Sequence, residues 1–348
     1  MTGGSRTNSA AGEQRAPARG RQRDGDGAFK RQPSRFRRWV SEDPGAEFPL
    51  APGRYHLYAA RACPWAHRTL IGRVLMGLED AIGVSFLHPF RDARGWAFSG
   101  DGYSDPLNGF RFLREAYTAT EPGYRDRVSV PVLWDSERRV IVSNESADVL
   151  RMLSTVFAPL ARHPVTLYPE PHRAEIDALN EQIYEHVNDA VYKAGFATRQ
   201  EVYEREVGSL FAALDALDRR LADRRFLFGS TPLETDWRLF TTLLRFDAVY
   251  HIHFKCSLRK LVEYEHLWPY ARDLYQSPGV AATVAFDEIR THYYRTHPKI
   301  NPTGLIAVRP AASFELAHGR AGLGATVGPP DGERGALRAS AATASGGA

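Results

Sequence analysis

Cys63 is the residue in this sequence best placed to do chemistry. It lies between a short apolar strand predicted over 55–58 and a helix predicted over 65–78, with Pro64 at the first helical position. A thiolate at the beginning of a helix faces unpaired backbone N–H groups and the positive end of the helix dipole, which favour the nucleophilic form. The basic side chains close to it in sequence are Arg61, His67 and Arg68. The pattern predicts a nucleophilic thiol, although a small apolar cysteine at a helix start is the structural alternative.

The spacing after Cys63 argues against a dithiol site. A thioredoxin-like Cys-x-x-Cys pair would place a second cysteine where Ala66 stands, and Cys256 is the only other cysteine in the chain. A mixed disulfide at Cys63 must therefore be cleared by a thiol from outside the chain, which predicts glutathione-type chemistry. We expect Cys256 to be a buried structural thiol.

A second motif, Ser143-Asn144-Glu145-Ser146, follows a predicted strand and opens a helix. Backbone amides and the Ser146 hydroxyl at such a helix start form an anion site, and Glu145 can accept an ammonium group. The pair suits the α-carboxylate and α-amino groups of a γ-glutamyl residue. Ordinary helix capping by Ser143 or Asn144 explains the same residues and is compatible with ligand binding.

The elements that position these residues follow the order of a thioredoxin fold. Strands are predicted over 55–58, 84–88, 130–134 and 139–142, and helices over 65–78, 110–119 and 145–156. Val130-Pro131 enters the third strand, where this fold has a cis peptide bond that turns the Val130 backbone toward the active site; an edge-strand proline is the alternative. A long loop over 89–108, which carries Trp96, interrupts the order and is expected to be functional.

The second half of the chain is predicted to be almost wholly helical. Helices are expected over 173–190, 201–223, 236–250, 267–276 and 279–292. The predicted fold class is thus an α/β thioredoxin-fold N-terminal domain followed by an all-α C-terminal glutathione-transferase domain. The predicted divisions are a disordered Arg-rich tail over 1–35, a glutathione-binding domain over 36–158, a linker over 159–171, a helical substrate domain over 172–310 and a disordered tail over 311–348.

Composition narrows the class of protein. The chain has 348 residues, 43% of them hydrophobic, a net charge of +4 and two cysteines. Two cysteines cannot form a disulfide framework, so we expect a reducing, cytoplasmic location. No apolar run approaches the ~20 residues that span a membrane, so no membrane partner is expected. The basic residues of the first forty positions are typical of a solvated tail, so no nucleic-acid partner is expected either.

Several motifs recur in order through both predicted domains. They include Cys63-Pro64-Trp65-Ala66-His67-Arg68-Thr69, Gly95-Trp96-x-Phe98, Asp105-Pro106-Leu107-Asn108-Gly109-Phe110, Val191-Tyr192-Lys193-Ala194-Gly195-Phe196, Arg245-Phe246-Asp247-Ala248-Val249-Tyr250 and His292-Tyr293-Tyr294. With the motifs above, they resemble the glutathionyl-hydroquinone reductases, the Xi class of glutathione transferases, over about 35–310. Arg61-Ala62 before the cysteine departs mildly from the family pattern.

The resemblance implies roles for particular residues. Cys63 would be the nucleophile that removes glutathione from an S-glutathionyl-hydroquinone. The implied glutathione site comprises Trp96, Val130, Glu145 and Ser146, with either Arg114 or Arg127. Tyr192 and Tyr293 would be catalytic hydroxyls at the hydroquinone pocket, with Tyr294 and His297 nearby. Core packing is the alternative for a tyrosine on an amphipathic helix.

The resemblance also implies the co-substrate and partners. Glutathione would be the co-substrate, and the chain would form a homodimer. No metal is expected, because His251, His253 and Cys256 have no fourth ligand in view. The predicted function is glutathione-dependent reduction of S-glutathionyl-hydroquinones through a Cys63–glutathione disulfide. Three alternatives remain: a conjugating transferase, which Cys63 disfavours, a deglutathionylase of other substrates, and a non-catalytic transferase-like binding module.

Overall fold

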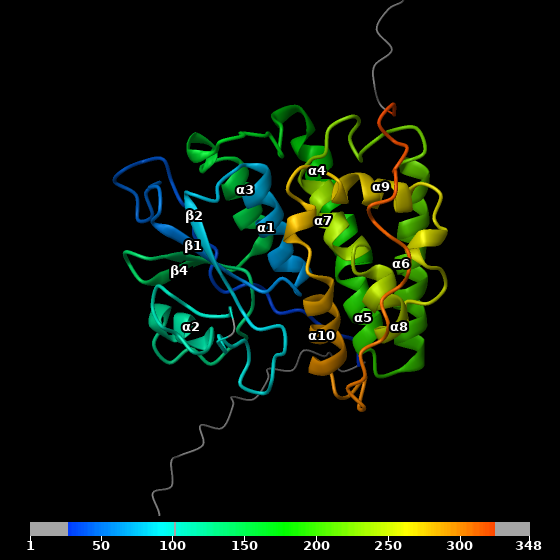
Figure 1. Cartoon of the computed structure of the whole chain (residues 1–348), viewed down its shortest axis with the longest axis horizontal. Coiled ribbons are helices and arrows are strands. Elements are labelled where there is room, and N and C mark those ends of the chain that lie inside the picture. The colour runs from blue at the N-terminus through cyan, green and yellow to red at the C-terminus, as the bar shows by residue number, and fades with distance from the viewer. Residues whose placement is uncertain (1–26, 101, 324–348) are drawn as a thin grey trace, which may run out of the picture.

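The computed structural model describes residues 27–100 and 102–323. Figure 1 shows an α/β half beside a helical half, which confirms the predicted fold class. The halves are joined by buried polar contacts as well as by apolar packing. Arg151 of helix α3 (Ser146–Ser154) donates from Nε to Glu234 Oε2 at 3.0 Å, at the start of helix α7 (Glu234–Leu243). This pair fixes the two domains that form the walls of the site.

The α/β half contains a four-stranded sheet of order β2-β1-β3-β4. The strands are β1 (Tyr55–Ala59), β2 (Ile82–Phe86), β3 (Val132–Asp135) and β4 (Val140–Ser143). β1 runs parallel to β2 and antiparallel to β3, and β3 runs antiparallel to β4. Because every residue of β1 is buried, the strand places its carboxyl end, and Cys63 after it, between covering layers.

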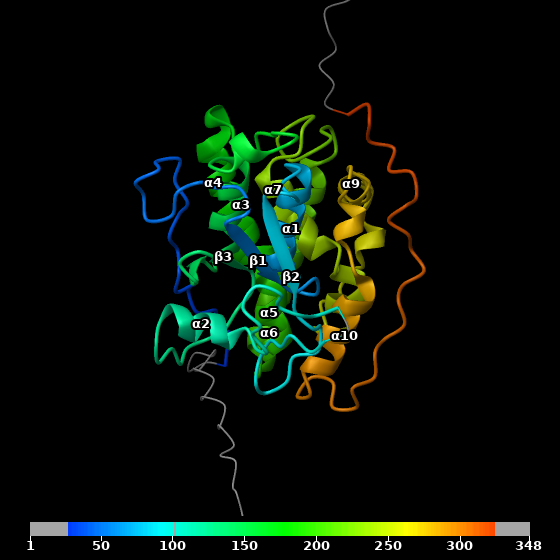
Figure 2. The same ribbon diagram turned by 60° about the vertical axis from the view of Figure 1, so that its left-hand side comes forward.

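Helices cover both faces of this sheet (Figure 2). Helix α1 (Pro64–Leu75) and α3 lie together on one face, where Leu57 and Leu133 pack in one apolar cluster with Leu153. Helix α2 (Arg114–Thr120) covers the other face, where Tyr117 joins the cluster of Tyr58. Alternate strand residues therefore supply two separate cores, as the period-two geometry of a strand requires.

The helical half packs around one apolar core. Its α-helices are α4 (Arg173–Ile183), α5 (Ala190–Phe196), α6 (Gln200–Arg220), α7, α8 (His251–His253), α9 (Leu267–Tyr275) and α10 (Phe286–Thr296). Trp237 and Leu243 of α7 lie fully buried at the centre of this core. π-helical segments at Tyr184–Asn188 and Phe246–Tyr250 interrupt the single helices expected over 173–190 and 236–250.

Several other element boundaries differ from the expected ones, for example the start of α2 at Arg114 in place of 110, and two of these differences have a clear local cause. The strand expected over 84–88 begins at Ile82, because Gly83 lacks the Cβ that would otherwise lie 2.6 Å from His56 Nδ1 on β1. The helix expected over 279–292 begins at Phe286. Gly279 has a φ of +78°, and the chain makes a 3₁₀ turn at Ala281–Thr283 before α10 starts.

The described parts of both expected tails are packed against the domains, which differs from the prediction of disorder over 1–35 and 311–348. Residues 27–35 contact both domains, with Phe29 buried. Phe314 is buried against Trp268 and Phe286, and the C-terminal segment runs along the outside of the helical half (Figure 2). The remaining positions, 1–26 and 324–348, lie outside the described residues.

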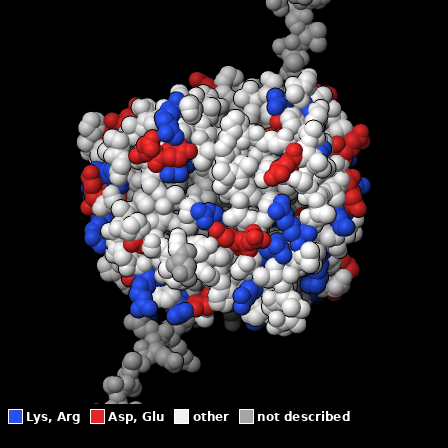
Figure 3. All heavy atoms as spheres, in the orientation of Figure 1, with Lys and Arg blue, Asp and Glu red and all other residues white. Residues whose placement is uncertain are grey.

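The surface carries both signs of charge. On the face in Figure 3, Lys and Arg are interspersed with Asp and Glu. Within 27–100 and 102–323, no helix is long and apolar enough to cross a membrane.

Candidate active site

Cys63 occupies the N-cap of helix α1 in an extended conformation, with Pro64 directly after it. The carbonyl of Cys63 accepts the first helical hydrogen bond, from His67 N at 3.0 Å, while its side chain caps nothing. The thiol is half-buried, and its Sγ lies 3.9 Å from the Val130 carbonyl oxygen. The Val130–Pro131 bond is cis, as expected. The local pattern thus places a half-buried thiol beside the Val130 backbone, just before strand β3.

A cleft of about 730 Å³ opens at Cys63 between the two domains. Both domains line it. The expected site residues among the lining are Cys63, Trp96, Arg127, Val130, Tyr192, Tyr293 and His297. The cleft therefore brings the thiol and the two tyrosines into one space, although they are far apart in sequence.

The two candidate arginines occupy different places. Arg127 lines the cleft, and burial lowers the pKa of its guanidinium while the charge of the Cys63 thiolate opposes that shift. Arg114 is at the start of α2 and is not among the residues that line the cleft. The geometry thus distinguishes two arginines that the sequence left as alternatives.

Trp96 is fixed by a contact between the domains. Its ring stacks on His292 of α10 with centroids 4.9 Å apart and an interplanar angle of 14°. His292 Nδ1 also lies 2.7 Å from the Pro89 carbonyl oxygen, at the start of the same loop. Burial lowers the pKa of His292 to about 3, so the ring is neutral and donates this hydrogen bond. The loop over 89–108 is held against the helical domain in this way.

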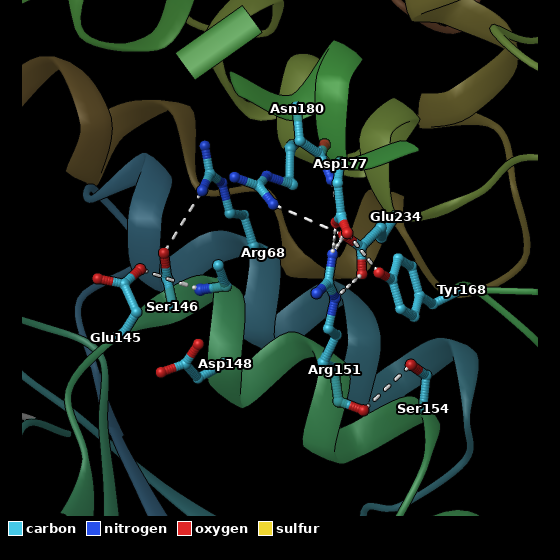
Figure 4. A network of polar contacts seen from close by, with 12 residues as sticks. Arg68, Glu145, Ser146, Asp148, Arg151, Ser154, Tyr168, Asp177, Asn180 and Glu234 are labelled. Atoms are coloured by element: carbon cyan, nitrogen blue, oxygen red, sulfur yellow. Dashed lines mark hydrogen bonds and ion pairs between the residues drawn. The ribbon is translucent and has the colours of Figure 1, made fainter. Parts of the chain in front are cut away.

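Glu145 is the N-cap of α3 and Ser146 is its first residue (Figure 4), and neither is among the residues that line the cleft. The Glu145 carboxylate caps α3 by accepting from Ala147 N at 3.2 Å. Ser146 Oγ lies 3.4 Å from Nη1 of Arg68, whose Nη2 donates to Asn188 Oδ1 at 2.9 Å. The cap is thus Glu145 and not Ser143 or Asn144, which the capping alternative named, and Arg68 connects the motif to the helical domain.

Arg68 is a buried cation without a carboxylate hydrogen-bond partner in the described chain. It is 1% exposed, and burial lowers its pKa to about 9, while the charges of Glu145 and the Cys63 thiolate act in the opposite direction. Its Nε has no hydrogen-bond partner among the described residues. The sequence indicated Arg68 only as nearby positive charge, but the structure links it to Ser146 at the start of α3 and to Asn188 of the helical domain.

Three tyrosine hydroxyls meet in the helical domain, and two of these tyrosines, Tyr192 and Tyr293, line the cleft. The Tyr192 and Tyr293 hydroxyl oxygens are 2.6 Å apart, and Tyr250 OH lies 3.0 Å from Tyr293 OH. Burial raises the pKa of Tyr192, so its hydroxyl stays protonated at neutral pH. Tyr250, which ends a π-helical segment, was not expected here; its position in the Arg245–Tyr250 motif was the only sequence signal.

Tyr294 and His297 differ in their relation to the cleft. Tyr294 does not line it: the side chain is buried, and its hydroxyl donates to the Ala248 carbonyl oxygen at 3.2 Å. Tyr293 of the same helix lines the cleft, whereas Tyr294 packs within the helical domain. His297 lines the cleft, with Nδ1 3.1 Å from His253 Nε2.

Arg245 holds the loop that precedes Cys63. Its fully buried guanidinium donates to the carbonyl oxygens of Ala62 at 3.0 Å and Arg61 at 2.9 Å. It also lies 3.3 Å from His67 Nδ1, and burial lowers the pKa of His67 well below its usual value. A helical-domain residue therefore fixes the backbone next to Cys63, a role that the sequence did not reveal.

Cys256 has different surroundings from Cys63. It is fully buried in the apolar core of the helical domain, and burial raises the pKa of its thiol. The described residues contain no group of three or more His, Cys, Asp or Glu side chains arranged to hold a metal ion.

Comparison with known proteins gives the family. The models for the glutathione S-transferase N-terminal and C-terminal domains match residues 62–156 and 200–273. The glutathionyl-hydroquinone reductase YqjG of Escherichia coli is 46% identical over 304 residues, which cover 84% of this chain and 92% of that protein. The glutathionyl-hydroquinone reductase PcpF of Sphingobium chlorophenolicum is 44% identical, covering 82% and 90%.

Solved structures agree with these relatives. A Xi-class glutathione transferase from Natrialba magadii superposes with a TM-score of 0.80 at 49% identity, covering 82% of this chain and 88% of that one. Glutathione-bound YqjG superposes with a TM-score of 0.79 at 46% identity, covering 82% and 96%. The chain therefore belongs to the glutathione S-transferase family, in its Xi class of glutathionyl-hydroquinone reductases.

Proposed function

We propose that this chain reduces S-glutathionyl-hydroquinones to hydroquinones with glutathione as co-substrate. The observation that carries the proposal is the single cleft in which the Cys63 thiol and the Tyr192–Tyr293 hydroxyl pair face the same space. Membership in the family of YqjG and PcpF supports the same reaction.

The first half-reaction begins with the keto tautomer of the bound adduct, in which the carbon bearing sulfur also bears hydrogen. The Cys63 thiolate attacks the glutathionyl sulfur, so an S–S bond forms and the C–S bond breaks. The electron pair of the C–S bond moves into the ring and restores the aromatic system as a phenolate. The tyrosine hydroxyls stabilise this oxygen by hydrogen bonding, and a proton converts it to the hydroquinone.

The second half-reaction regenerates the enzyme. A glutathione thiolate attacks the glutathionyl sulfur of the Cys63–glutathione disulfide, releases oxidised glutathione and returns Cys63 as the thiolate. Overall, the adduct and one glutathione give one hydroquinone and one oxidised glutathione. The two electrons that reduce the ring carbon come from the two sulfur atoms that form the disulfide, namely the thioether sulfur of the adduct and the thiol of free glutathione.

The remaining site residues have proposed roles in binding glutathione. Trp96, Arg127 and the Val130 backbone lie beside Cys63 and would hold the glutathionyl group. Glu145 and Ser146 would bind its γ-glutamyl end, with the buried Arg68 behind them. Because Arg127 lines the cleft and Arg114 does not, we assign the glutathione-binding arginine to Arg127.

Two further proposals concern the state of the protein. We propose a homodimer, as expected from the resemblance, which sedimentation of the purified chain would detect as twice the monomer mass. We also propose a cytoplasmic location, because the Cys63 reaction cycle requires a reducing thiol pool.

A turnover assay tests the proposed function. Purified protein is incubated with 2-(S-glutathionyl)hydroquinone and glutathione, and hydroquinone and oxidised glutathione are quantified. We expect equal amounts of both products; hydroquinone without oxidised glutathione, or neither product, would overturn the proposal. Parallel arms with another small thiol, a glutathionylated peptide and an electrophile for conjugation distinguish the co-substrate and the alternative activities.

A further inference from the structure

Residues 27–38, here called the N-terminal strap, join the two domains across the cleft (Figure 1). At one end, Phe29 packs against Phe196 of α5 with ring centroids 5.4 Å apart. At the other end, Phe36 N donates to Asn144 Oδ1 and Asn144 N donates to the Phe36 carbonyl oxygen, both at 3.0 Å. Ser34 Oγ donates to Glu145 Oε2 at 2.9 Å. The strap therefore has anchors on both walls of the site.

Arg31 lies midway along this strap and lines the cleft. Its guanidinium carbon is 4.5 Å from the ring centroid of Trp65 and 4.9 Å from that of Tyr192. Its Nε donates to Asp189 Oδ1 at 2.6 Å, and the Asp189 carbonyl oxygen accepts from Tyr192 N at 3.0 Å. The Arg31 cation is thus held between the ring of Trp65, two positions after Cys63, and the ring of Tyr192.

The surroundings keep Arg31 charged. Burial alone would lower the pKa of Arg31, but the neighbouring Asp189 carboxylate raises it overall. The side chain is only 14% exposed, and its Nη2 has no hydrogen-bond partner among the described residues. A weakly hydrated cation interacts with an oxygen anion more strongly than an exposed one, because less water screens the pair.

We propose that the strap completes the hydroquinone end of the cleft, where the Arg31 cation binds the ring oxygen that becomes anionic when the C–S bond breaks. This inference rests on the proposed function for the identity of the ligand. In this inference, residues 27–35, which the sequence predicted to be part of a disordered tail, contribute to substrate binding. Tyrosine hydroxyls donate hydrogen bonds to that oxygen, and Arg31 supplies the charge that those neutral donors lack.

Binding without turnover tests this role. In a Cys63→Ser background, calorimetry gives the Kd of 2-(S-glutathionyl)hydroquinone and of S-phenylglutathione, which has no ring oxygen. Arg31→Gln should weaken binding of the hydroquinone adduct by about tenfold and that of the phenyl adduct by about twofold or less. The matched control is Arg35→Gln, in the same strap, whose exposed side chain pairs with the exposed Glu121; it should change neither Kd.

Two outcomes would overturn the inference. Equal weakening of both ligands would assign Arg31 a purely structural role, and an unchanged Kd for the hydroquinone adduct would exclude its contact with the ring oxygen. Because Arg31→Gln leaves the buried Asp189 unpaired, Arg31→Gln with Asp189→Asn provides a neutral pair if the single variant does not fold. Arg31→Lys keeps the positive charge. It should therefore restore part of the difference in Kd between the hydroquinone adduct and the phenyl adduct.

Turnover by the unsubstituted protein separates this inference from the proposed function. If the protein does not turn over the adduct, yet Arg31→Gln selectively weakens its binding, the proposed reaction fails and the binding role stands. If turnover occurs and the selective weakening is absent, the reaction stands and the role of Arg31 fails.

Discussion

The two ends of the cleft are built in different ways. The thiol end takes Cys63 and Val130 from segments that adjoin two strands of one sheet, so short sequence motifs place both residues. The tyrosine end takes Tyr192, Tyr250 and Tyr293 from three separate segments of the helical domain. The position of the proposed nucleophile is therefore a local property of the chain, whereas the position of the proposed leaving-group site depends on how the helical domain packs.

The two ends also differ in electrostatics. Arg127 and the buried Arg68 place positive charge near Cys63, which suits a thiolate and an anionic tripeptide. The tyrosine hydroxyls are neutral donors that bond to one another, because burial raises the pKa of Tyr192 and Tyr293, and the Arg31 cation beside them is paired with the Asp189 carboxylate. If each end serves its own half-reaction, substitutions should separate the two half-reactions as described below.

Cys63→Ser should have the largest effect, because both half-reactions pass through this sulfur. We expect turnover of the glutathionyl adduct to fall by at least about 10³-fold, since a hydroxyl is little ionised and forms no mixed disulfide. Cys256→Ala, in the apolar core, should retain turnover. Steady-state kinetics of both variants checks this, and a Cys63→Ser variant with a tenth or more of the original rate contradicts it.

Tyr192→Phe and Tyr293→Phe should affect only the half-reaction that releases hydroquinone. Loss of one donor to a developing oxyanion costs about 10²–10³-fold in a well-formed site, and we expect about 10–100-fold here because the hydroxyls share the role. The reaction of Cys63 with oxidised glutathione should change by less than about twofold. Tyr294→Phe is the matched control on the same helix, with its hydroxyl on Ala248 O. Equal losses in both half-reactions would show that the tyrosines are structural.

Arg127→Gln should affect mainly the binding of glutathione. Loss of a charge-assisted hydrogen bond costs about 1.4 kcal/mol, so we expect about a tenfold higher KM for glutathione with a smaller change in kcat. Arg114→Gln, outside the cleft lining, should leave KM within about twofold. A larger effect from Arg114→Gln would reverse the assignment.

The pH dependence of folding stability should depend in part on His56, which lies in the sheet next to Cys63. It is buried on β1, with Nε2 2.8 Å from Ser85 Oγ, and burial lowers its pKa to about 4 from the usual 6.5. Between these values the unfolded chain binds the proton that the folded chain excludes, so the free energy of unfolding falls as pH falls. We expect this histidine to contribute a loss of about 2 kcal/mol between about pH 7 and pH 5.

Denaturant unfolding at both pH values measures this contribution. His56→Gln should reduce the loss on acidification, whereas His172→Gln, at an exposed position, should leave it unchanged. An identical pH dependence for His56→Gln and the unsubstituted protein would show that His56 does not carry the effect.

The sequence predicted the thiol end well because its signals are local. A proline after Cys63, a Val-Pro before a strand and a polar motif at the start of α3 each constrain backbone within a few residues. The same reasoning placed the fold class, since element order follows from hydrophobic periodicity. The sequence could not decide whether Arg114 or Arg127 lines the cleft, because this depends on the path of the loop between α2 and β3.

The rest of the site depends on contacts between distant segments. Tyr250 reaches the Tyr293 hydroxyl from the end of a π-helical segment that interrupts the expected helix, and helical periodicity does not reveal this. Arg31 lies in a polar, aperiodic segment that has the composition of a disordered tail, yet it pairs with Asp189, which is 158 positions away. Composition predicts whether a segment can fold alone and does not predict its docking onto a formed surface.

The most direct test of the central claim is a single turnover without glutathione. The protein is mixed with one equivalent of 2-(S-glutathionyl)hydroquinone, and released hydroquinone, intact mass and peptide map are measured together. We predict one hydroquinone released per chain, with one glutathionyl group on the peptide that carries Cys63 and none on the peptide that carries Cys256. Hydroquinone release without an adduct on Cys63, or an adduct on Cys256, would contradict the account.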